Sequence, residues 1–451
     1  MERNSFRVVI VGGSIAGLTL AHCLARAGID YVVLEKRGEV APQEGASVGI
    51  MPNGARILQQ LGLYDALEEL VHPLEEAHVV YPDGFRYTSQ YPRVLRERFG
   101  YSLAFLDRQQ VLAILADRLP HPDRLRTGTA VERLEGQGDG RPLRVYCRDG
   151  SSYEGDLIVG ADGVHSVVRK AMWQMSGISA QQEQQRMRVQ YACVFGISSP
   201  APNVCAGQQI TSYSHGRSIL SVVGKHGRIY WFLFRRLSHD YHYGNAPRFS
   251  REDAIQYCTS LAREPYWQDT SFGDLWERRV MFNMTAVEEY VLKQWHYGQV
   301  VCIGDSAHKI APHTGQGANC AMEDAAVLSS LLVQQLQQPS RKTVPSLAEW
   351  EHMFTAFTQL RRKRTLQVAH AAGMAMRLHA LEGLFRRVLA RYYLPYAKDM
   401  PADRASKGIA DAPLLRFLPV PERSGPGWVL FASEAKTRSP VARSFLLTVI
   451  G

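Results

Sequence analysis

Apolar residues near the N-terminus change from strand-like to helix-like spacing and back. The run 6–11 is short and rich in β-branched residues, which is typical of a buried parallel strand. After a glycine-rich turn, residues 18–27 have helical periodicity, and Gly28 stands where that helix should end. A second apolar run, Tyr31–Leu34, ends on Glu35. This order predicts a strand–helix–strand unit whose first strand leads directly into the glycine turn.

The rest of the chain follows two other patterns. Four runs alternate apolar and polar residues between turns, which predicts an antiparallel sheet; they are 187–197, 208–213, 217–224 and 228–234. Beyond residue 345 the periodicity is helical, and Ser346 with Glu349 forms a capping box.

We therefore predict an α/β fold in which a Rossmann-like domain is interleaved with an antiparallel-sheet domain and followed by a helical region. The expected bounds are 1–75, 100–185 and 280–345 for the Rossmann-like domain, 76–99 and 186–279 for the sheet domain, and 346–451 for the C-terminal helical region.

The turn after the first strand has the residues of a dinucleotide site. Gly12 permits a tight turn, Gly17 lets the next helix pack closely on the sheet, and the helix N-terminus offers N–H groups to a pyrophosphate. Glu35 is placed to accept hydrogen bonds from ribose hydroxyls, which favours FAD or NAD over NADP. Ser14 replaces the usual middle glycine. The turn also resembles the nucleophile elbow of a hydrolase, but that elbow normally lies well inside its fold.

Two later strand–turn–helix motifs extend this site. One apolar strand runs into Asp162-Gly163, and another ends on Gly304-Asp305. The second is followed by a glycine-rich loop in which Gly317 and Ala318 open a helix. An N-terminus at that place would stabilise negative charge on the pyrimidine ring of a reduced flavin. Asp305 could then hydrogen-bond the ribityl chain, so the dinucleotide is expected to be FAD.

In this order the three motifs resemble those of class A flavin monooxygenases, which have the para-hydroxybenzoate hydroxylase fold. The resemblance covers roughly residues 6–345. Within that group the chain is most similar to fungal epoxidases of indole-diterpene and meroterpenoid pathways, through the stretches 45–56 and 105–108. The fold predicted above would then be an FAD-binding domain interleaved with a substrate-binding domain.

The resemblance also implies roles for three more residues. It places Gly49 along the flavin, Arg108 at the phosphate or ribityl region of FAD, and Tyr213 in the active site, where a phenol could hydrogen-bond the substrate or the flavin hydroperoxide. Two alternatives stay open. Arg108 could form a salt bridge with its neighbour Asp107, and Tyr213 could be an ordinary sheet residue.

The implied activity is that of an FAD-dependent monooxygenase. NAD(P)H would reduce FAD, O2 would add at C4a, and the electrophilic hydroperoxide would transfer one oxygen atom. Because only one dinucleotide unit is evident, NAD(P)H is expected to bind transiently in a groove near residues 162–169. The resemblance favours epoxidation of a prenyl or polyene alkene in a small hydrophobic terpenoid, meroterpenoid or polyketide.

Three other functions stay open. An aromatic hydroxylase usually needs a base to ionise its phenol, and no convincing base is evident in the sequence. A flavin halogenase would carry a W-x-W-x-I-P motif, which this sequence lacks. The third is a flavin-binding scaffold without turnover.

Composition and charge change this interpretation little. The net charge is +9, and the densest basic run, 361–364, follows an apolar-periodic segment, so a solvated helix face is expected there. No basic face with interleaved aromatic residues is evident, which argues against a nucleic-acid partner. The seven scattered cysteines contain no C-x-x-C pair and argue against a disulfide framework or a metal site. His308 and His313 flank the last glycine loop, where a structural role is expected for both.

No apolar run is long enough to span a bilayer, and the N-terminus has no signal pattern, so a cytoplasmic enzyme is expected. The apolar pieces 428–431 and 445–450 are expected to pack against the body of the protein. Peripheral contact with an intracellular membrane is their alternative use.

Overall fold

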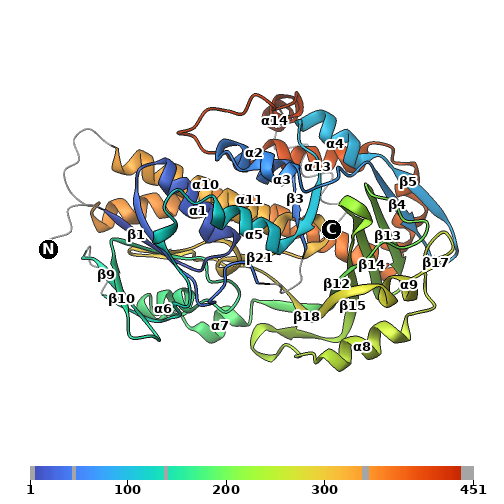
Figure 1. The fold of residues 1–451 in the computed structure, drawn as a ribbon, viewed down its shortest axis with the longest axis horizontal. Coiled ribbons are helices and arrows are strands. Elements are labelled where there is room, and N and C mark those ends of the chain that lie inside the picture. Colours follow the sequence, from blue (N-terminus) through green and yellow to red (C-terminus); the bar gives the residue numbers. More distant parts are fainter. Residues whose placement is uncertain (1–5, 43–46, 137–140, 338–344, 438–451) are drawn as a thin grey trace.

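Two β-sheets lie side by side along the long axis of the molecule and position the other elements (Figure 1). The computed structural model describes residues 6–42, 47–136, 141–337 and 345–437. The smaller sheet contains the N-terminal strand, and the larger sheet contains the long strands of the middle region.

The smaller sheet forms because apolar runs from distant parts of the chain pair in parallel. Its central strand β1 (Arg7–Val11) lies between β2 (Asp30–Leu34) and β11 (Leu157–Gly160). These strands are almost wholly buried, which explains their unbroken runs of Val, Ile and Leu. The predicted strand–helix–strand unit is therefore confirmed. The full order is β19 (His296–Tyr297), β20 (Val300–Cys302), β11, β1, β2 and β7 (Leu125–Arg126).

Helices cover one side of this sheet, and a small antiparallel sheet covers the other (Figure 1). α1 (Ile15–Arg26) packs against α10 (Gln316–Leu336). The chain leaves α1 through Gly28, whose φ of +69° is the left-handed conformation that glycine adopts at helix ends. The small antiparallel sheet consists of β10 (Ser152–Gly155), β9 (Leu143–Cys147) and β8 (Val131–Glu135). The connecting segments contain α2 (Pro52–Gln60), α3 (Tyr64–Glu68), α4 (Tyr91–Phe99), α5 (Arg108–Asp117), α6 (Val167–Met175), α7 (Ala180–Gln184) and the strand pair β3 (Ser47–Ile50) and β6 (Ala104–Asp107).

The larger sheet confirms the antiparallel pattern predicted for the middle region. Its neighbours run antiparallel except for β13 and β4, which are parallel. Its apolar faces pack on α8 (Arg251–Ser260) and α9 (Phe272–Glu277) on one side and on the C-terminal helices on the other. Its order is β21 (His308–Lys309), β18 (Arg279–Val291), β12 (Arg188–Ser198), β15 (Ile229–His242), β14 (Arg217–Val223), β13 (Gln208–Ser214), β4 (Glu76–Val80) and β5 (Arg86–Ser89), and a short pair, β16 (Pro265–Trp267) and β17 (Thr270–Ser271), lies beside it.

One expected domain bound falls inside a strand. β18 pairs with β12 from Arg279 to Glu289, so the chain stays in the larger sheet past residue 280. It returns to the smaller sheet at β19. The alternating pattern of β18 was the signal for this, because a strand paired on one sheet cannot be divided between two domains.

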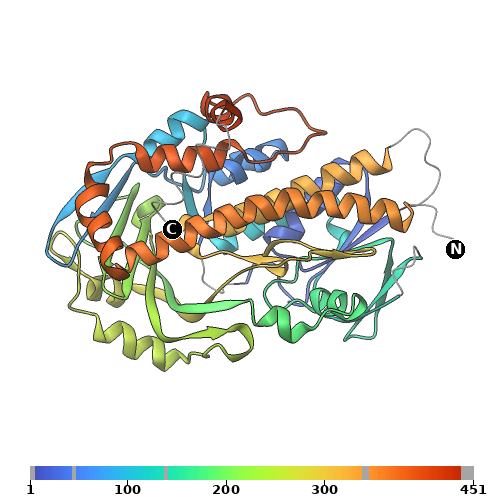
Figure 2. The ribbon, with the colours of Figure 1, turned by 180° about the vertical axis from the view of Figure 1, so that it is seen from behind.

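The C-terminal region is helical, as predicted. α11 (Leu347–His379) begins at the Ser346 capping box and runs along the back of the molecule from the smaller sheet to the larger one (Figure 2). Residues 414–421, which the sequence predicts as a return segment, pack on the body of the protein, because the Gln60 side chain bonds both the N–H and the carbonyl of Leu415. The remaining helices are α12 (Gly383–Val388), the π-helical turn η6 (Leu389–Tyr393), the 3-10 turn η7 (Leu394–Tyr396), α13 (Met400–Ala410) and α14 (Gly427–Thr437).

The two apolar C-terminal pieces have different outcomes. Residues 428–431 lie in α14, where Trp428 and Phe431 are buried against Phe99. Residues 445–450 lie outside the described part of the chain, as do residues 45 and 46 of the 45–56 stretch. Among the described residues, no helix is both long and apolar enough to cross a bilayer.

Candidate functional site: an FAD site at the junction of the two sheets

Only glycine fits at two positions between the end of β1 and the first turn of α1. Gly12 has φ +109°, and a Cβ there would lie 2.4 Å from the carbonyl oxygen of Ala161. A Cβ on Gly17 would lie 1.9 Å from the carbonyl oxygen of Gly12. Both distances are far below van der Waals contact, so the close approach of turn, helix and β11 requires both glycines.

The Glu35 carboxylate is oriented by backbone groups at the end of β2. Its Oε2 accepts the N–H of Gly13 at 2.7 Å, and its Oε1 accepts the N–H of Arg37 at 2.9 Å. Each oxygen has further lone pairs, so the carboxylate can still accept ribose hydroxyls. The expected role of Glu35 is compatible with this geometry.

Ser14, the irregular position of the turn, is bonded to Arg108. The Arg108 guanidinium donates to Ser14 Oγ at 2.9 Å, which brings the first residue of α5 to the N-terminus of α1. The Asp107 carboxylate, the partner of Arg108 in the alternative interpretation, accepts both Nε and Nη2 of Arg228 at 3.0 and 2.9 Å. Arg108 therefore contacts the dinucleotide turn, which is compatible with its expected place at the phosphate or ribityl region of FAD.

The two later motifs are bonded to each other. Ser306 Oγ accepts the N–H of Gly163 at 2.9 Å and donates to Asp162 Oδ1 at 3.1 Å. Asp162 Oδ2 also accepts the N–H of Val167 at 2.7 Å, at the start of α6. Asp162 thus holds the first turn of α6 and the loop after β20 in one arrangement.

Arg169 is buried rather than a surface residue of the predicted groove. Its guanidinium donates to the carbonyls of Ser306 and Val164 at 3.0 and 2.6 Å and lies over the ring of Trp173. A guanidinium whose donors are used in this way crosslinks the two motifs and does not present itself to a ligand.

Asp305 lies in the short turn after β20, next to these crosslinks. Its carboxylate pairs with Lys309, and its carbonyl accepts the hydroxyl of Tyr290 at 2.5 Å. The carboxylate is partly exposed, so it has lone pairs left for a ribityl hydroxyl.

Asn319, which is not among the predicted site residues, connects the first turn of α10 to β3. Its Nδ2 donates to the carbonyls of Gly49 and Gly315 at 2.8 and 2.7 Å, and its Oδ1 accepts the N–H of Met51 at 3.0 Å. The expected flavin-side residue Gly49 and the N-terminus of α10 are therefore held together. Its place at the end of the Gly-Gln-Gly-Ala-Asn motif was the available signal.

The N-terminus of α10 faces open space. A Cβ on Gly317 would meet nothing within 4 Å, Ala318 follows in the same turn, and the helix begins at Gly315 without a side-chain cap or an acidic residue in its first turn. The N-terminus of α1 likewise has no side-chain cap and no acidic residue. Two helix ends with N–H groups left for an anionic ligand fit a pyrophosphate at α1 and a flavin ring at α10.

A buried ion cluster holds α10 against α11 behind this site. Arg361 donates to Glu323 Oε2 and Asp324 Oδ1, each at 2.7 Å, and His308 lies 2.7 Å from Asp324 Oδ2. Arg364 bonds both oxygens of Glu323 at 2.6 Å. Burial opposes ionisation, but the guanidinium groups hold the pKa of Glu323 below its ordinary value.

The basic run 361–364 is thus not the solvated face that the sequence suggested. Arg361 is only 1% exposed, because the partners of the run lie on another helix and leave no mark in the local pattern. The structural role expected for His308 agrees with its place in this cluster.

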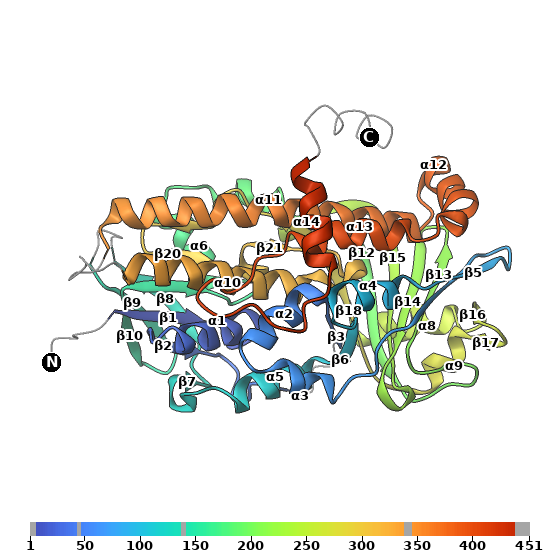
Figure 3. The same cartoon turned by 90° about the horizontal axis from the view of Figure 1, so that it is seen from above.

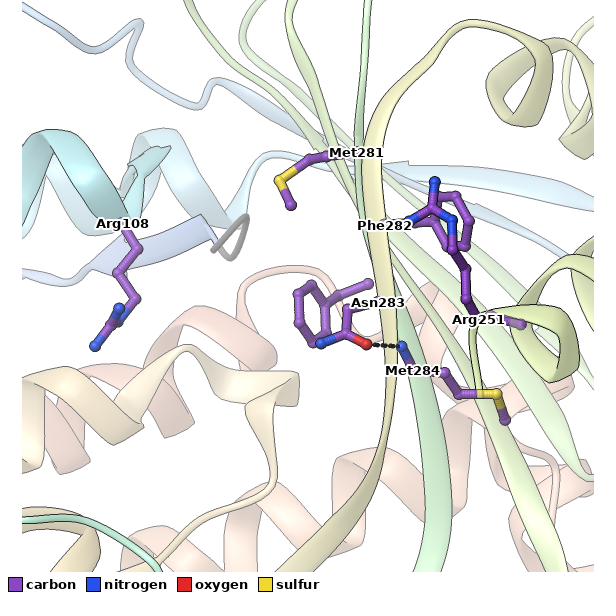
Figure 4. Close-up of a pocket in the computed structure, with 8 residues that line it drawn as sticks. Arg108, Arg251, Met281, Phe282, Asn283 and Met284 are labelled. Atoms are coloured by element: carbon purple, nitrogen blue, oxygen red, sulfur yellow. Dashed lines mark hydrogen bonds between the residues drawn. The ribbon is translucent and has the colours of Figure 1, made fainter. Parts of the chain in front are cut away.

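A pocket of about 610 Å³ opens between Arg108 and the edge of the larger sheet. Figure 4 shows Arg108 on one side of the gap and the β18 residues Met281 and Asn283 on the other. The remaining lining residues are Phe195, Arg251, Ala254, Phe282 and Met284. Its lining combines apolar side chains with the polar Arg108, Arg251 and Asn283, and its volume is that of a small-molecule site.

Tyr213 lies in an aromatic cluster on the larger sheet and is not among the residues that line this pocket. Its ring stacks on His379 with centroids 4.6 Å apart and meets Tyr81 edge-on at 5.2 Å. Burial raises the pKa of Tyr213 well above its ordinary value, so the phenol stays protonated and can donate a hydrogen bond.

His313 and His379 join this cluster from the loop before α10 and from the end of α11. Their ring centroids are 5.2 Å apart, and the His313 ring lies 3.9 Å from that of Phe234. Burial lowers the pKa of His379 to about 4 and holds that of His313 well below its ordinary value. Both imidazoles are therefore neutral at pH 7.

Comparison with known proteins agrees with this geometry. The family of FAD-binding domains matches residues 5–346. The chain is 50% identical to the FAD-dependent monooxygenase pyr5 of Aspergillus fumigatus over 99% of its length and 96% of that protein. It is 44% identical to the FAD-dependent monooxygenase atmM of Aspergillus flavus over 100% of its length and 94% of that protein.

Solved structures show the same fold at lower identity. Klebsiella pneumoniae HpxO complexed with FAD and uric acid superimposes with a TM-score of 0.75 at 22% identity, over 90% of this chain and 97% of that one. Pseudomonas aeruginosa PqsL in complex with 2-aminobenzoylacetate superimposes with a TM-score of 0.66 at 20% identity, over 85% of this chain and 98% of that one. The chain therefore belongs to the FAD-dependent monooxygenases of the para-hydroxybenzoate hydroxylase fold, together with its relatives from fungi.

Proposed function

We propose that this monooxygenase uses NAD(P)H and O2 to epoxidise a prenyl or polyene alkene in a small hydrophobic terpenoid, meroterpenoid or polyketide. The observation that carries the proposal is the lining of the pocket beside Arg108. Phe195, Met281, Phe282 and Met284 form the apolar part of this lining, which suits a hydrocarbon chain, and FAD, when bound, supplies the activation of O2.

The pocket favours an alkene over a phenol. A phenol is commonly ionised by a carboxylate, a histidine or a lysine before it is attacked, and none of these side chains lines the pocket. An isolated alkene needs no such base, because its electrons are already available to an electrophilic oxygen. The protein then has to orient the chain and to exclude water, and the apolar side chains of β12 and β18 can do both. Aromatic hydroxylation remains the second candidate because the fold is the same.

NAD(P)H is proposed to bind transiently near residues 162–169. Since Arg169 is buried, the contacts would come from exposed groups of the same region, such as His165 and Lys170. Measuring flavin reduction with NADH and with NADPH, in the protein and in Lys170→Ala, tests this. Unchanged affinity for the reductant in the variant would contradict a site there.

Tyr213 does not line the pocket beside Arg108, but its ring is connected through His379 to His313 of the loop before α10. From this position we propose that its phenol, which stays protonated, donates a hydrogen bond during oxygen transfer. Tyr213→Phe keeps the ring stacked on His379 and removes only the hydroxyl, so we expect a fall in kcat of about tenfold to a hundredfold without loss of FAD. Full activity in this variant would make Tyr213 a packing residue of the sheet.

The reaction itself is tested with purified protein carrying FAD. Prenylated and polyene precursors are incubated with NADPH or NADH under 18O2, and mass spectrometry measures the products. We expect a gain of one labelled oxygen and an epoxide that acid opens to a diol. A phenolic product would favour the aromatic hydroxylase, and oxidation of NAD(P)H without an oxygenated product from any precursor would contradict both.

A further inference from the structure

An exposed apolar patch lies at the end of the molecule farthest from the N-terminus. It follows α11 and comprises α12, η6 and η7, which form a short projecting turn beside the larger sheet (Figure 3). Single exposed apolar residues are common, but a cluster of this density marks an interaction surface. The exposed residues, which we name the α12 patch, are Leu384, Phe385, Val388, Tyr392, Tyr393 and Tyr396.

The charges around the α12 patch are mostly basic. Residues 382–399 contain Arg386, Arg387, Arg391 and Lys398, and at the two ends the acidic residues Glu382, which pairs with Arg236, and Asp399. Arg387 and Lys398 are exposed, whereas Arg391 pairs with Asp83 at 2.9 Å and lies over the ring of Phe85. Leucine, phenylalanine and tyrosine side chains beside an excess of basic residues are typical of a surface that lies at the interface of an anionic bilayer.

The inner side of the patch is firmly packed. Ala390 and Leu381 are buried in one cluster with Tyr81 and Tyr213, and the Tyr81 hydroxyl donates to the Ala390 carbonyl at 2.5 Å. The exposed side chains therefore project from a fixed base. That base is the aromatic cluster of Tyr213 on the larger sheet.

We propose that the α12 patch docks the enzyme on an anionic lipid bilayer, with Leu384 and Phe385 at the level of the headgroups and Arg387 and Lys398 on lipid phosphates. Docking itself does not depend on the proposed reaction. The advantage of docking rests on the proposed function, because a hydrophobic substrate dissolved in the bilayer would lie close to the larger sheet of the docked enzyme. The surface differs from the C-terminal pieces that the sequence suggested for membrane contact.

The test is flotation of the full chain, loaded with FAD, with vesicles of phosphatidylcholine alone and of phosphatidylcholine mixed with phosphatidylserine. We expect binding to the mixed vesicles that weakens with added salt. Leu384→Ser combined with Phe385→Ser should lower the fraction bound at least about tenfold, because two apolar anchors are lost. Arg387→Gln with Lys398→Gln should weaken binding to the mixed vesicles and reduce its dependence on salt.

The matched control is Val429→Ser with Leu430→Ser in α14. These residues are 75% and 55% exposed, comparable with 76% for Leu384 and 60% for Phe385, but they lie outside the α12 patch. This control should float like the parent protein. All variants are compared by FAD content and by Tm, so that a loss of binding is not confused with a loss of folding.

Three outcomes would overturn the proposal. The first is that the parent protein does not bind the mixed vesicles. The second is that the Leu384→Ser, Phe385→Ser variant binds them as well as the parent. The third is that the parent is a dimer which only this variant dissociates, because a second copy of the chain would then cover the patch. The proposed reaction is measured separately, with substrate dispersed in detergent. Oxygenation without flotation contradicts docking alone, and flotation without oxygenation contradicts the reaction alone.

Discussion

At the scale of single residues, Ser14 is the position where this dinucleotide turn departs from the usual three glycines. Its hydroxyl accepts a hydrogen bond from the Arg108 guanidinium at 2.9 Å and so fixes a cation at the start of α1. We expect Ser14→Gly to restore the usual fingerprint and yet weaken FAD binding, because a hydrogen bond to a charged group is worth about 1.5–3 kcal/mol, or roughly tenfold to a hundredfold in Kd. Fluorescence titration of the apoprotein with FAD measures the change.

The control for this prediction is a double-mutant cycle. In an Arg108→Gln background the charged donor is absent, so adding Ser14→Gly should cost little further affinity. Equal losses in the two backgrounds would mean that the serine contributes independently of Arg108.

The second prediction at this scale concerns Gly12. Gly12→Ala would place a Cβ 2.4 Å from the Ala161 carbonyl, at a φ of +109° that alanine rarely adopts. We expect β1 and β11 to separate and the protein to be isolated with little FAD. Gly28→Ala is the matched control, since Gly28 also has positive φ but no atom within 4 Å of the new Cβ. It should lower stability by about 1 kcal/mol and retain FAD.

The sequence was informative about such residues when their role was local. Gly12, Gly17 and Gly28 could be assigned because a tight turn and a helix end need glycine in a known place. The partners of charged residues could not. Asp107 pairs with Arg228, which is distant in sequence, and nothing in the local pattern distinguishes that from a bond to its neighbour Arg108.

At the scale of elements, the contact between α10 and α11 depends on a buried charge cluster. Arg361→Met keeps most of the side-chain volume but leaves Glu323 and Asp324 short of a partner in a buried site. Removing one partner of a buried pair costs about 3–5 kcal/mol, so we expect a large fall in the free energy of unfolding. Chemical denaturation followed by circular dichroism measures it.

Lys363→Met is the control for the charge cluster. Lys363 is two residues away on the same helix and is exposed, so its replacement should change stability by less than about 0.5 kcal/mol. Similar losses in the two variants would indicate that helix propensity or net charge, rather than the buried pairs, is responsible.

Periodicity predicted most elements but not their tertiary surroundings. The apolar runs of β1, β2 and β12 define those strands, because burial of whole faces leaves a regular pattern. β15 extends to His242, beyond the expected end at residue 234, since its last residues are polar and are held by pairing with β12. The α12 patch was not predicted either, because exposure depends on which face of a helix its neighbours leave uncovered.

At the scale of the whole molecule, two neutral, partly buried histidines lie where the larger sheet meets the C-terminal helices and the loop before α10. His379 from α11 stacks on Tyr213 of the larger sheet, and His313 from the loop before α10 lies beside it. These contacts connect the loop at the FAD site, the larger sheet and the C-terminal helices. Protonating either ring would place a charge in that apolar junction, so its integrity should depend on pH.

The last prediction follows from the sign of this effect. Burial lowers the pKa of His379 to about 4 in the folded protein, whereas an unfolded chain has an ordinary pKa of about 6.5. Below pH 6.5 the unfolded state therefore binds more protons, and stability falls as the pH decreases towards 4. We expect His379→Phe, which keeps an aromatic ring against Tyr213, to remove roughly 1–3 kcal/mol of that acid-induced loss. The measurement is the denaturation midpoint and the FAD content at pH 7, 6, 5 and 4, a range that spans both pKa values.

The exposed His215 provides the control, since His215→Phe should leave the slope between pH 6.5 and 4 unchanged. If His379→Phe has the same slope as the parent, the acid sensitivity resides in other buried histidines, such as His22 and His296, whose pKa values burial also lowers.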